Sequence, residues 1–579
     1  MPELLSFSFV ASVFSQFHQL LQLTSQRTPR GIRARSRSIP LGLLFAIAAI
    51  FLPGCSSNSA PPMLASIDIT PSSSSIIVST STTFTATAKD SRGNVLNGLV
   101  FTWNSSTPTV ASVGSTSGTA LGLLAGTTQI TASANGIMSA PFTLNVTPGF
   151  LLTGGLGIPR NFSTATLLNN GMVLVTGGNA NLLASDSLTS AELYNPATGT
   201  FTPTGNMNVG HNFHTATLLD NGKVLIAGGI TTSNAAIPTA ELYDPATGTF
   251  SLTGNMNSGR YLHTATLLQN GTVLMASGIT TNGAEIYDPS TGTFSPTGSM
   301  TELHEAGTAV LLNNGKVLVA GGLNATGYTA TSEIFDPAVG VFTLTGSMNA
   351  TRDLFTATLL NNGKVLVAGG VSNGNPSSGA ELYDPATGVF TPTGSLNSVR
   401  FRHSATLLTN GTVLITGGDM SSITFGGSAE LYDPSAGTFA IAGSLNTARA
   451  SHTATLLGNG TILIVGGTTS ETPKAGEELY EPGSLIPTGL QSIAVTPATA
   501  SISSGSSQRF VAMGTFAGGT QQLASAIWTS SVPATALISN DISNRGSIQI
   551  VSAPAAMTSV TVTAAAGSVT GSATLNVNP

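Results

Sequence analysis

Cationic side chains recur at one position of a sequence repeat that occurs seven times between about residues 150 and 485. Arginine and histidine at regular spacing can bind anions or pair with carboxylates. This column is therefore our candidate binding site. Its members are Arg160, His211, Arg260, His304, Arg352, Arg400 and Arg449.

A glutamate also recurs once in each copy, in a Glu-(Leu/Ile)-(Tyr/Phe) triplet. A carboxylate buried without a partner is costly, so each glutamate should have a cationic partner or several N–H donors. Two alternatives follow for the cationic column: an ion-pair lattice with these glutamates, or a cationic mouth that binds an acidic polysaccharide or peptide. The glutamates are Glu192, Glu241, Glu285, Glu333, Glu381, Glu430 and Glu478.

A second column, three residues further on, carries histidine in four copies and Ser163, Gly307 and Phe355 in the others. A ring of imidazoles could hold a metal, but no carboxylate shares the column. We expect hydrogen bonds to the backbone of a neighbouring repeat instead, and no metal. The histidines are His214, His263, His403 and His452.

Catalysis would require one or two copies to depart from the consensus. The clearest departure is at Glu302, His304 and Glu305, which form the one cluster to test for catalysis. The HExxH and CxxC motifs are missing from the sequence. We therefore expect no enzyme activity and no cofactor.

The repeat that positions these residues reads as four strands. An Asn-Gly pair, which favours a tight hairpin turn, separates two apolar runs in every copy, as at Asn170-Gly171. The third run ends in turn residues such as Asp-Pro, and the fourth begins at a phenylalanine such as Phe250. A repeat of 44 to 51 residues has the length of a propeller blade.

These repeats resemble the kelch repeat, specifically the bacterial kind related to galactose oxidase propellers. The matching features are the double glycine, the Tyr-Asp-Pro before an aromatic residue, and the arginine that opens the next repeat, although Phe stands where kelch usually has Trp. The resemblance implies a fold that carries both enzymes and binding proteins. It also implies that arginines at this position can line a pocket for acidic peptides. Copper radical oxidases of this fold need a cysteine crosslinked to a tyrosine, and Cys55, the only cysteine, lies outside the repeats.

The N-terminal segment indicates export. Five arginines precede an apolar run from Leu41 to Leu52, which is too short to span a bilayer and fits the core of a signal peptide. The run ends in Leu52-Pro53-Gly54-Cys55, which looks like a lipobox and predicts lipid attachment at Cys55. An ordinary cleaved signal peptide is the alternative. We divide this part into a signal peptide (1–55) and a tether (56–63).

Two similar segments flank the repeats, at 64–147 and 489–578. Both have short alternating strands, which predict a small β-sandwich, and each has one tryptophan, Trp103 or Trp528, at the same place. Thr70-Pro71, Thr496-Pro497 and the two Trp-x-Ser-Ser motifs resemble bacterial Ig-like domains of group 2. We expect both tryptophans to be core residues.

The predicted fold class is all-β: a seven-bladed kelch-type propeller over 149–485, flanked by two Ig-like β-sandwiches. The seventh copy lacks its fourth strand, so residues 150–156, which align with the fourth strand of the other copies, should close the last blade. The two chain joints should lie on the face opposite the cationic column.

The function expected from the sequence is a non-catalytic cell-surface binding or adhesion scaffold, whose propeller recognises an extracellular glycan or protein. The alternative is an extracellular lyase or hydrolase acting on a polysaccharide. A net charge of -6, with no basic run after Arg37, excludes nucleic acid as an expected partner. We expect a monomer that is exported and lipid-anchored, at the outer membrane or cell surface.

Overall fold

The computed structural model describes residues 62–579, except 182–186, 234, 280, 422–423, 470–475 and 504–505. The predicted signal peptide, Cys55 and almost all of the tether lie outside the described residues. Every regular element in the described part is a β-strand. None of the described segments forms a helix long and apolar enough to cross a membrane.

The described residues divide into two compact units, of which one holds 62–66 and 88–97 and the other holds 67–87 and the described part of 98–579. In the first unit, β4 (Val95–Leu96) pairs with the end of β3 (Ser81–Asp90) as a short hairpin. β1 runs over Leu64–Pro71.

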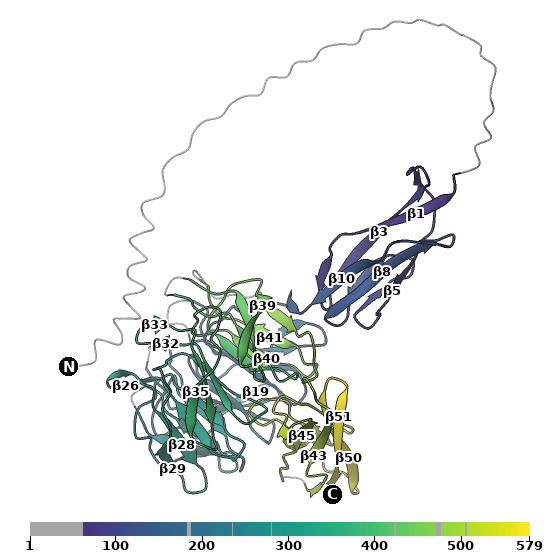
Figure 1. Cartoon of the computed structure of the whole chain (residues 1–579). Helices are drawn as coiled ribbons and strands as arrows, with labels where there is room; N and C mark the ends of the chain where they lie inside the picture. The colour runs from purple at the N-terminus through teal and green to yellow at the C-terminus, as the bar shows by residue number, and fades with distance from the viewer. Residues whose placement is uncertain are drawn as a thin grey trace, which may run out of the picture. The chain divides into compact units, whose positions relative to one another are not determined.

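Residues 149–481 form seven four-stranded antiparallel sheets among the described residues (Figure 1). The innermost strands are β12 (Thr164–Leu167), β16 (Thr215–Leu218), β20 (Thr264–Leu267), β24 (Thr308–Leu311), β30 (Thr356–Leu359), β36 (Ser404–Leu407) and β40 (Thr453–Leu456). The second strands are β13 (Val173–Thr176), β17 (Val224–Ala227), β21 (Val273–Ala276), β25 (Val317–Ala320), β31 (Val365–Ala368), β37 (Val413–Thr416) and β41 (Ile462–Val465).

The third strands are β14 (Ala191–Asn195), β18 (Ala240–Asp244), β22 (Ala284–Asp288), β28 (Ser332–Asp336), β34 (Ala380–Asp384), β38 (Ser428–Asp433) and β42 (Glu478–Glu481). The outer strands are β15 (Thr200–Pro203), β19 (Thr249–Leu252), β23 (Thr293–Pro296), β29 (Val341–Leu344), β35 (Val389–Pro392), β39 (Thr438–Ser444) and β11 (Gly149–Leu152). Two short hairpins follow second strands: β26 (Leu323–Asn324) with β27 (Gly327–Tyr328), and β32 (Val371–Ser372) with β33 (Asn375–Pro376).

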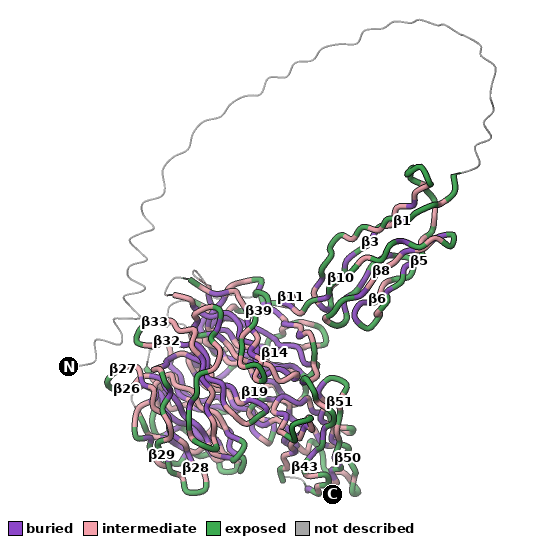
Figure 2. Tube along the Cα trace, viewed as in Figure 1, coloured by how far each residue is buried: buried purple, intermediate pink, exposed green. Residues whose placement is uncertain are grey.

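The sheets are arranged around an axis. Each innermost strand contacts the innermost strands of the two neighbouring sheets, and β40 returns to contact β12, so the series closes on itself. The second strands are buried along their whole length, because neighbouring sheets cover both of their faces. Figure 2 shows the buried segments running through the sheets and the exposed ones at the connecting turns. This arrangement is that of an all-β propeller.

One sheet combines strands from the two ends of the repeat region. β11 pairs antiparallel with β42, with Phe150 opposite Tyr480, and their rings lie 4.9 Å apart. This is the pairing that the sequence predicts for the closing strand. It leaves the seventh sheet with four strands like the others and covers the edge of β42.

Each flanking segment forms two packed sheets. In the N-terminal one, β3, β7 (Thr119–Gly122) and β6 (Ala111–Val113) form one sheet. The second sheet runs β2 (Ser75–Ile77), β10 (Phe142–Thr147), β8 (Gly126–Ala134) and β5 (Thr102–Ser105), with β9 (Ile137–Met138) on β8. Trp103 is buried in this segment, as expected.

The C-terminal segment has a sheet of β43 (Ser492–Thr496), β45 (Val511–Phe516) and β46 (Gly519–Gln522). A second sheet runs β44 (Thr499–Ile502), β51 (Val569–Val577), β50 (Thr558–Ala566) and β47 (Ile527–Ser530), and β48 (Ala536–Ile538) pairs with β49 (Ile548–Ile550). Trp528 is buried in its core.

The C-terminal segment docks against the propeller at the ends of the innermost strands. Asp541 Oδ2 accepts the Leu167 N–H at 3.1 Å, Asn361 Oδ1 accepts the Ala524 N–H at 3.0 Å, and Ser525 Oγ donates to Leu408 O at 2.7 Å. A cavity of about 480 Å³ lies along the axis between this segment and the innermost strands. The opposite ends of those strands, where the cationic column lies, make none of these contacts.

Candidate functional site

The cationic column lies inside the molecule. Arg352, which is 2% exposed, donates from Nη2 to Glu381 Oε1 at 3.0 Å. Its Nη1 donates to the carbonyls of Gly369 at 2.9 Å and Gly379 at 2.8 Å. The other side of the carboxylate is also occupied, because Glu381 Oε2 accepts the backbone and side-chain N–H groups of Asn349, both at 2.7 Å. The guanidinium and the carboxylate are thus paired and hydrogen-bonded, as buried charges require.

The same pairing recurs around the propeller. Arg160, Arg260 and Arg400 donate to the glutamates of their own sheets at 2.9, 2.7 and 2.6 Å. Arg449 contacts two glutamates, Glu478 at 3.2 Å and Glu477 at 3.5 Å.

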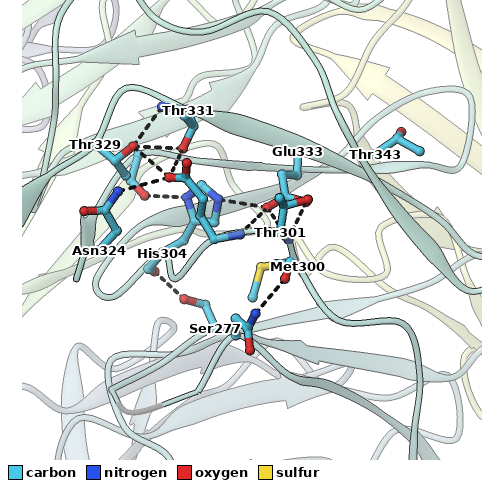
Figure 3. A network of polar contacts seen from close by, with 12 residues as sticks. Ser277, Met300, Thr301, His304, Asn324, Thr329, Thr331, Glu333 and Thr343 are labelled. Atoms are coloured by element: carbon cyan, nitrogen blue, oxygen red, sulfur yellow. Dashed lines mark hydrogen bonds and ion pairs between the residues drawn. The ribbon is translucent and has the colours of Figure 1, made fainter. Parts of the chain in front are cut away.

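Histidine replaces arginine in two copies. His304 Nε2 lies 3.4 Å from Glu333 Oε1, and its Nδ1 lies 2.8 Å from Gly321 O (Figure 3). His211 has the same relation to Glu241. Burial raises the pKa of Glu333, but hydrogen bonds from His304 and from the N–H groups of Thr301 and Glu302 outweigh it, so this pKa lies below its ordinary value. Figure 3 also shows Ser277, which breaks the double glycine of the third copy, donating its hydroxyl to the His304 carbonyl.

These contacts agree with the lattice alternative. A cationic mouth requires partly exposed cations, whereas all seven cations of the column are at most 2% exposed. We therefore correct the candidate binding site: the seven residues are buried structural residues, each paired with a glutamate of its own sheet. They are Arg160, His211, Arg260, His304, Arg352, Arg400 and Arg449.

The second histidine column is also structural. Each imidazole reaches a hydroxyl on the preceding sheet, as His263 Nε2 does to Thr215 Oγ1 at 3.1 Å and His403 Nε2 to Thr356 Oγ1 at 3.0 Å. Our expectation of backbone partners was wrong, because the threonines of the innermost strands present hydroxyls at this level. Burial, followed by the field of Arg260, lowers the pKa of His263 to about 3, so this ring is neutral at physiological pH.

The structure separates the cluster proposed for catalysis. Glu302 accepts hydrogen bonds from Asn324 Nδ2 and Thr331 Oγ1, both at 3.0 Å, and so holds the loop between β25 and β28. His304 belongs to the lattice. Glu305 lies at the start of the innermost strands, near Asp353 and Tyr261, which the sequence analysis did not single out.

This end of the propeller axis has an unusual backbone. One residue in each copy, immediately before the second histidine column, has a left-handed conformation with φ between 50° and 57°. Four backbone hydrogen bonds join neighbouring members, such as Arg402 N–H to Leu354 O at 3.1 Å and Ser451 N–H to Arg402 O at 2.9 Å. Strained non-glycine residues of this kind persist where the surroundings hold them, often at functional sites. The seven are Phe162, Phe213, Leu262, Ala306, Leu354, Arg402 and Ser451.

Side chains from these residues and their neighbours form a ring around the axis, which we call the mouth ring. Aromatic rings lie on one side: Phe162 and Phe213 are 4.1 Å apart, and Phe213 and Tyr261 are 6.4 Å apart. The Arg402 guanidinium closes the ring by lying 6.0 Å from the Phe162 ring centre. The mouth ring comprises Phe162, Phe213, Tyr261, Glu305, Asp353, Arg402 and Asp419.

Carboxyl groups lie on the other side of the mouth ring. Burial raises the pKa of Asp353 to about 7, and the neighbouring Glu305 adds to the effect while Arg402 opposes it. Burial raises the pKa of Asp419 to about 6, against the field of Arg402, whose Nη1 lies 3.6 Å from Asp419 Oδ2. Burial also raises the pKa of Glu305. The pKa values of Asp353 and Asp419 thus lie in the range where a carboxyl can exchange a proton near neutral pH.

The sequence held a signal for this ring. The cationic column is constant in type, but the position after it varies, reading Asn161, Asn212, Tyr261, Glu305, Asp353, Phe401 and Ala450, and the left-handed position that follows varies as well. Variation at adjacent positions of a regular repeat marks residues that packing does not decide.

The comparisons with known proteins agree with this architecture. The family model described as "Kelch motif" matches residues 355–397, which is one copy of the repeat. A solved structure of a fungal alcohol oxidase of the AA5 family, in complex with copper, is similar to this chain at 16% identity and a TM-score of 0.50, covering 74% of this chain and 99% of the other. No curated protein sequence matches. At this identity the likeness shows the fold: the chain is an all-β propeller, and one copy of its repeat matches the kelch motif.

The comparison with the oxidase corrects the function expected from the sequence. We expected a non-catalytic binding or adhesion scaffold for an extracellular glycan or protein, because the repeats look regular. The similar solved structure is an enzyme with bound copper. The fold therefore gives no reason to prefer a scaffold, and we withdraw that expectation together with the candidate site that supported it.

Copper itself does not suit the residues of this chain. Among the described residues, no three His, Cys, Asp or Glu side chains lie close enough together to hold a metal ion. The one cysteine, Cys55, precedes the repeats, so no propeller cysteine can crosslink to a tyrosine. The described histidines are committed to the lattice and to inter-sheet hydroxyls. We derive no step through copper.

Proposed function

We propose that this chain acts on a small polar molecule at the mouth ring, and that Asp353 is the group that gives and takes a proton there. The observation that carries this proposal is the state of the Asp353 side chain. It is 6% exposed, and its Oδ1 has no hydrogen-bond partner within the described part of the chain. Buried polar atoms normally have partners, so an exception calls for a ligand or a proton.

The surroundings of Asp353 support acid–base work. A general acid or base is most effective when its pKa lies near the working pH, and burial brings this carboxyl to about 7. The charge of Glu305 raises the pKa of Asp353, whereas the charge of Arg402 lowers it. Their balance makes the protonation of Asp353 responsive to a bound polar molecule.

The test is a screen of small polar metabolites against the full chain by ligand-observed NMR, followed by product analysis for every molecule that binds. We expect at least one molecule to bind the native chain and to lose binding in Asp353→Asn. The matched control is Asp384→Asn, because Asp384 lies at the surface with Lys364 at 3.2 Å. Equal binding by the two variants would place the site elsewhere.

We also propose the finer architecture and the location of the protein. The seven four-stranded sheets are the seven blades of a kelch propeller, and the segments 64–147 and 489–578 are bacterial Ig-like domains. The chain is exported as a monomer and is held at a membrane, most simply the outer membrane, by a lipid on Cys55. The lipobox supports this attachment, because Cys55 is the only cysteine and follows the apolar run directly.

Membrane fractionation tests the anchor. Native protein should sediment with membranes, and Cys55→Ser should move to the soluble fraction. If Cys55→Ser stays with the membrane, the lipid proposal fails.

A further inference from the structure

We infer that the molecule taken up by the mouth ring is a small organic cation, with a primary ammonium or guanidinium head. This inference rests on the proposed function of the ring and names the chemical class of its ligand. It is carried by three features of the ring: its acceptors without partners, its excess of carboxyls, and the way it already holds Arg402.

The first feature is the kind of polar atom that lacks a partner. Five of the unpartnered buried side-chain atoms at this end of the axis are oxygens: Asp353 Oδ1, Asp419 Oδ1, Asn161 Oδ1, Asn212 Oδ1 and Ser451 Oγ. Among these residues the one unpartnered nitrogen is Asn212 Nδ2, on a residue that is 0% exposed. A set rich in acceptors calls for a ligand rich in donors, and ammonium and guanidinium groups carry donors only.

The second feature is charge. Glu305, Asp353 and Asp419 follow one another on three successive sheets, and Arg402 is the one cation within the ring. The other ionisable groups facing these carboxyls are the phenols of Tyr261, which feels Glu305, and of Tyr328, which feels Asp353. A bound cation would therefore favour the ionised carboxyls that burial disfavours.

The third feature is the geometry around Arg402. Its guanidinium lies beside the Asp419 carboxylate at 3.6 Å and over the rings of Phe401 at 5.7 Å and Phe162 at 6.0 Å. A carboxylate combined with aromatic faces is an environment that receives organic cations. The other carboxyls also have aromatic neighbours, because the Tyr328 phenol feels the charge of Asp353 and the Tyr261 phenol feels that of Glu305.

A metal ion is the alternative cation, and the donor geometry does not favour it. The described carboxyls of the ring do not converge as a set of three ligands. Their aromatic neighbours suit a delocalised or alkylated cation better than a hard metal ion, which prefers an all-oxygen shell.

The test uses four probes that share a butyl chain: butylamine, butylguanidine, butanol and butyrate. Calorimetric titration of the full chain at pH 8 should show binding of the first two only. Asp353→Asn should weaken that binding at least tenfold, and so should a shift to pH 5.5, where Asp353 takes a proton. Asp384→Asn should change nothing.

A second variant, which should strengthen binding, distinguishes loss of the site from misfolding. Arg402→Gln removes the internal cation that occupies Asp419 and Phe162, so it should tighten butylguanidine binding severalfold. Loss of binding in Arg402→Gln would overturn the inference. Binding of butanol or butyrate that depends on Asp353 would also overturn it, while leaving the proposed function standing. If none of the four probes binds, the cation inference fails, and the metabolite screen judges the proposed function separately.

Discussion

At the residue scale, the same charged side-chain types have two different roles in this propeller, and their surroundings decide which. Arg352 has its donors used by Glu381 and two carbonyls, so it serves stability. Arg402 lies at the opening, where its side chain is 40% exposed and its carboxylate partner is 3.6 Å away. The two arginines lie in different columns of the same repeat. Only Arg402 is exposed enough to exchange its partner, Asp419, for a ligand.

The lattice gives a stability prediction. Replacing Arg352 with Met should leave Glu381 buried without its cation, which typically costs about 3–5 kcal/mol. The double variant Arg352→Met with Glu381→Leu should recover much of that loss, because it removes the uncompensated charge. Urea unfolding at pH 7 measures both.

The exposed pair Lys364–Asp384 is the control for this experiment. Lys364→Met should cost at most about 1 kcal/mol, because solvent screens a surface ion pair. A double variant no more stable than Arg352→Met would show that the buried charge is not the origin of the cost.

Glu477 gives a prediction about pH. Burial raises its pKa to about 7, against the opposing field of Arg449. A carboxyl whose pKa is higher in the folded state stabilises the fold below its unfolded pKa, and this contribution is lost as pH rises through about 7. Glu477→Gln should therefore be more stable than the native chain at pH 8, by on the order of 2 kcal/mol.

At pH 5 the advantage of Glu477→Gln should disappear, because native Glu477 is then protonated. Thermal unfolding of both proteins across pH 5 to 8 measures the difference. An advantage that does not change with pH would mean that the amide stabilises by packing and not by removing a charge.

At the element scale, the seventh sheet differs from the other six. Its outer strand, β11, comes before the first copy of the repeat in the sequence, whereas its other three strands belong to the last copy. Phe150 packs on Tyr480 much as Phe201 packs on Tyr194 within a continuous copy, with ring distances of 4.9 and 4.8 Å. The local contacts are alike, but loss of β11 would expose the edge of β42 to other chains.

This difference makes a matched pair of variants informative. Phe150→Ala and Phe201→Ala should each cost about 3–5 kcal/mol, since each removes a packed aromatic ring. Only Phe150→Ala should also favour oligomers, because release of β11 frees an edge for pairing. Light scattering on the two variants tests this, and equal aggregation would argue against a special role of the closing strand.

At the scale of the whole molecule, the C-terminal segment and the propeller share an interface of side-chain to backbone hydrogen bonds. Asp541 and Asn361 each satisfy an N–H of the other partner. Buried polar groups at such a contact lose their partners if the two separate, so we expect the two parts to unfold together.

Differential scanning calorimetry of the full chain tests this coupling. Replacing Asn361 and Ser525 with alanine should split the transition or lower its midpoint by several degrees. The control is Asn94→Ala, in an exposed turn of the other compact unit that is held by Asp90. An unchanged transition in the interface variant would show that the two parts are thermally independent.

Much of the architecture follows from the sequence alone. Asn-Gly turns and the apolar second strands recur in all seven copies and the double glycine in six, and each depends on local chemistry. Their recurrence was therefore enough to predict the strands, their order and the closing position of residues 150–152. The pairing of Arg or His with one glutamate per copy was predictable as one of two alternatives, since a buried carboxylate needs a partner.

Only the tertiary structure decided between those alternatives, because burial of the cationic column depends on how neighbouring sheets cover it. It also brought Glu305, Asp353 and Asp419 together. These residues are 48 and 66 positions apart in the chain, and they meet because successive copies wrap around one axis. The spacing of residues in the sequence predicts which strand each residue precedes. The closure of the seven sheets around one axis determines which side chains come close to one another.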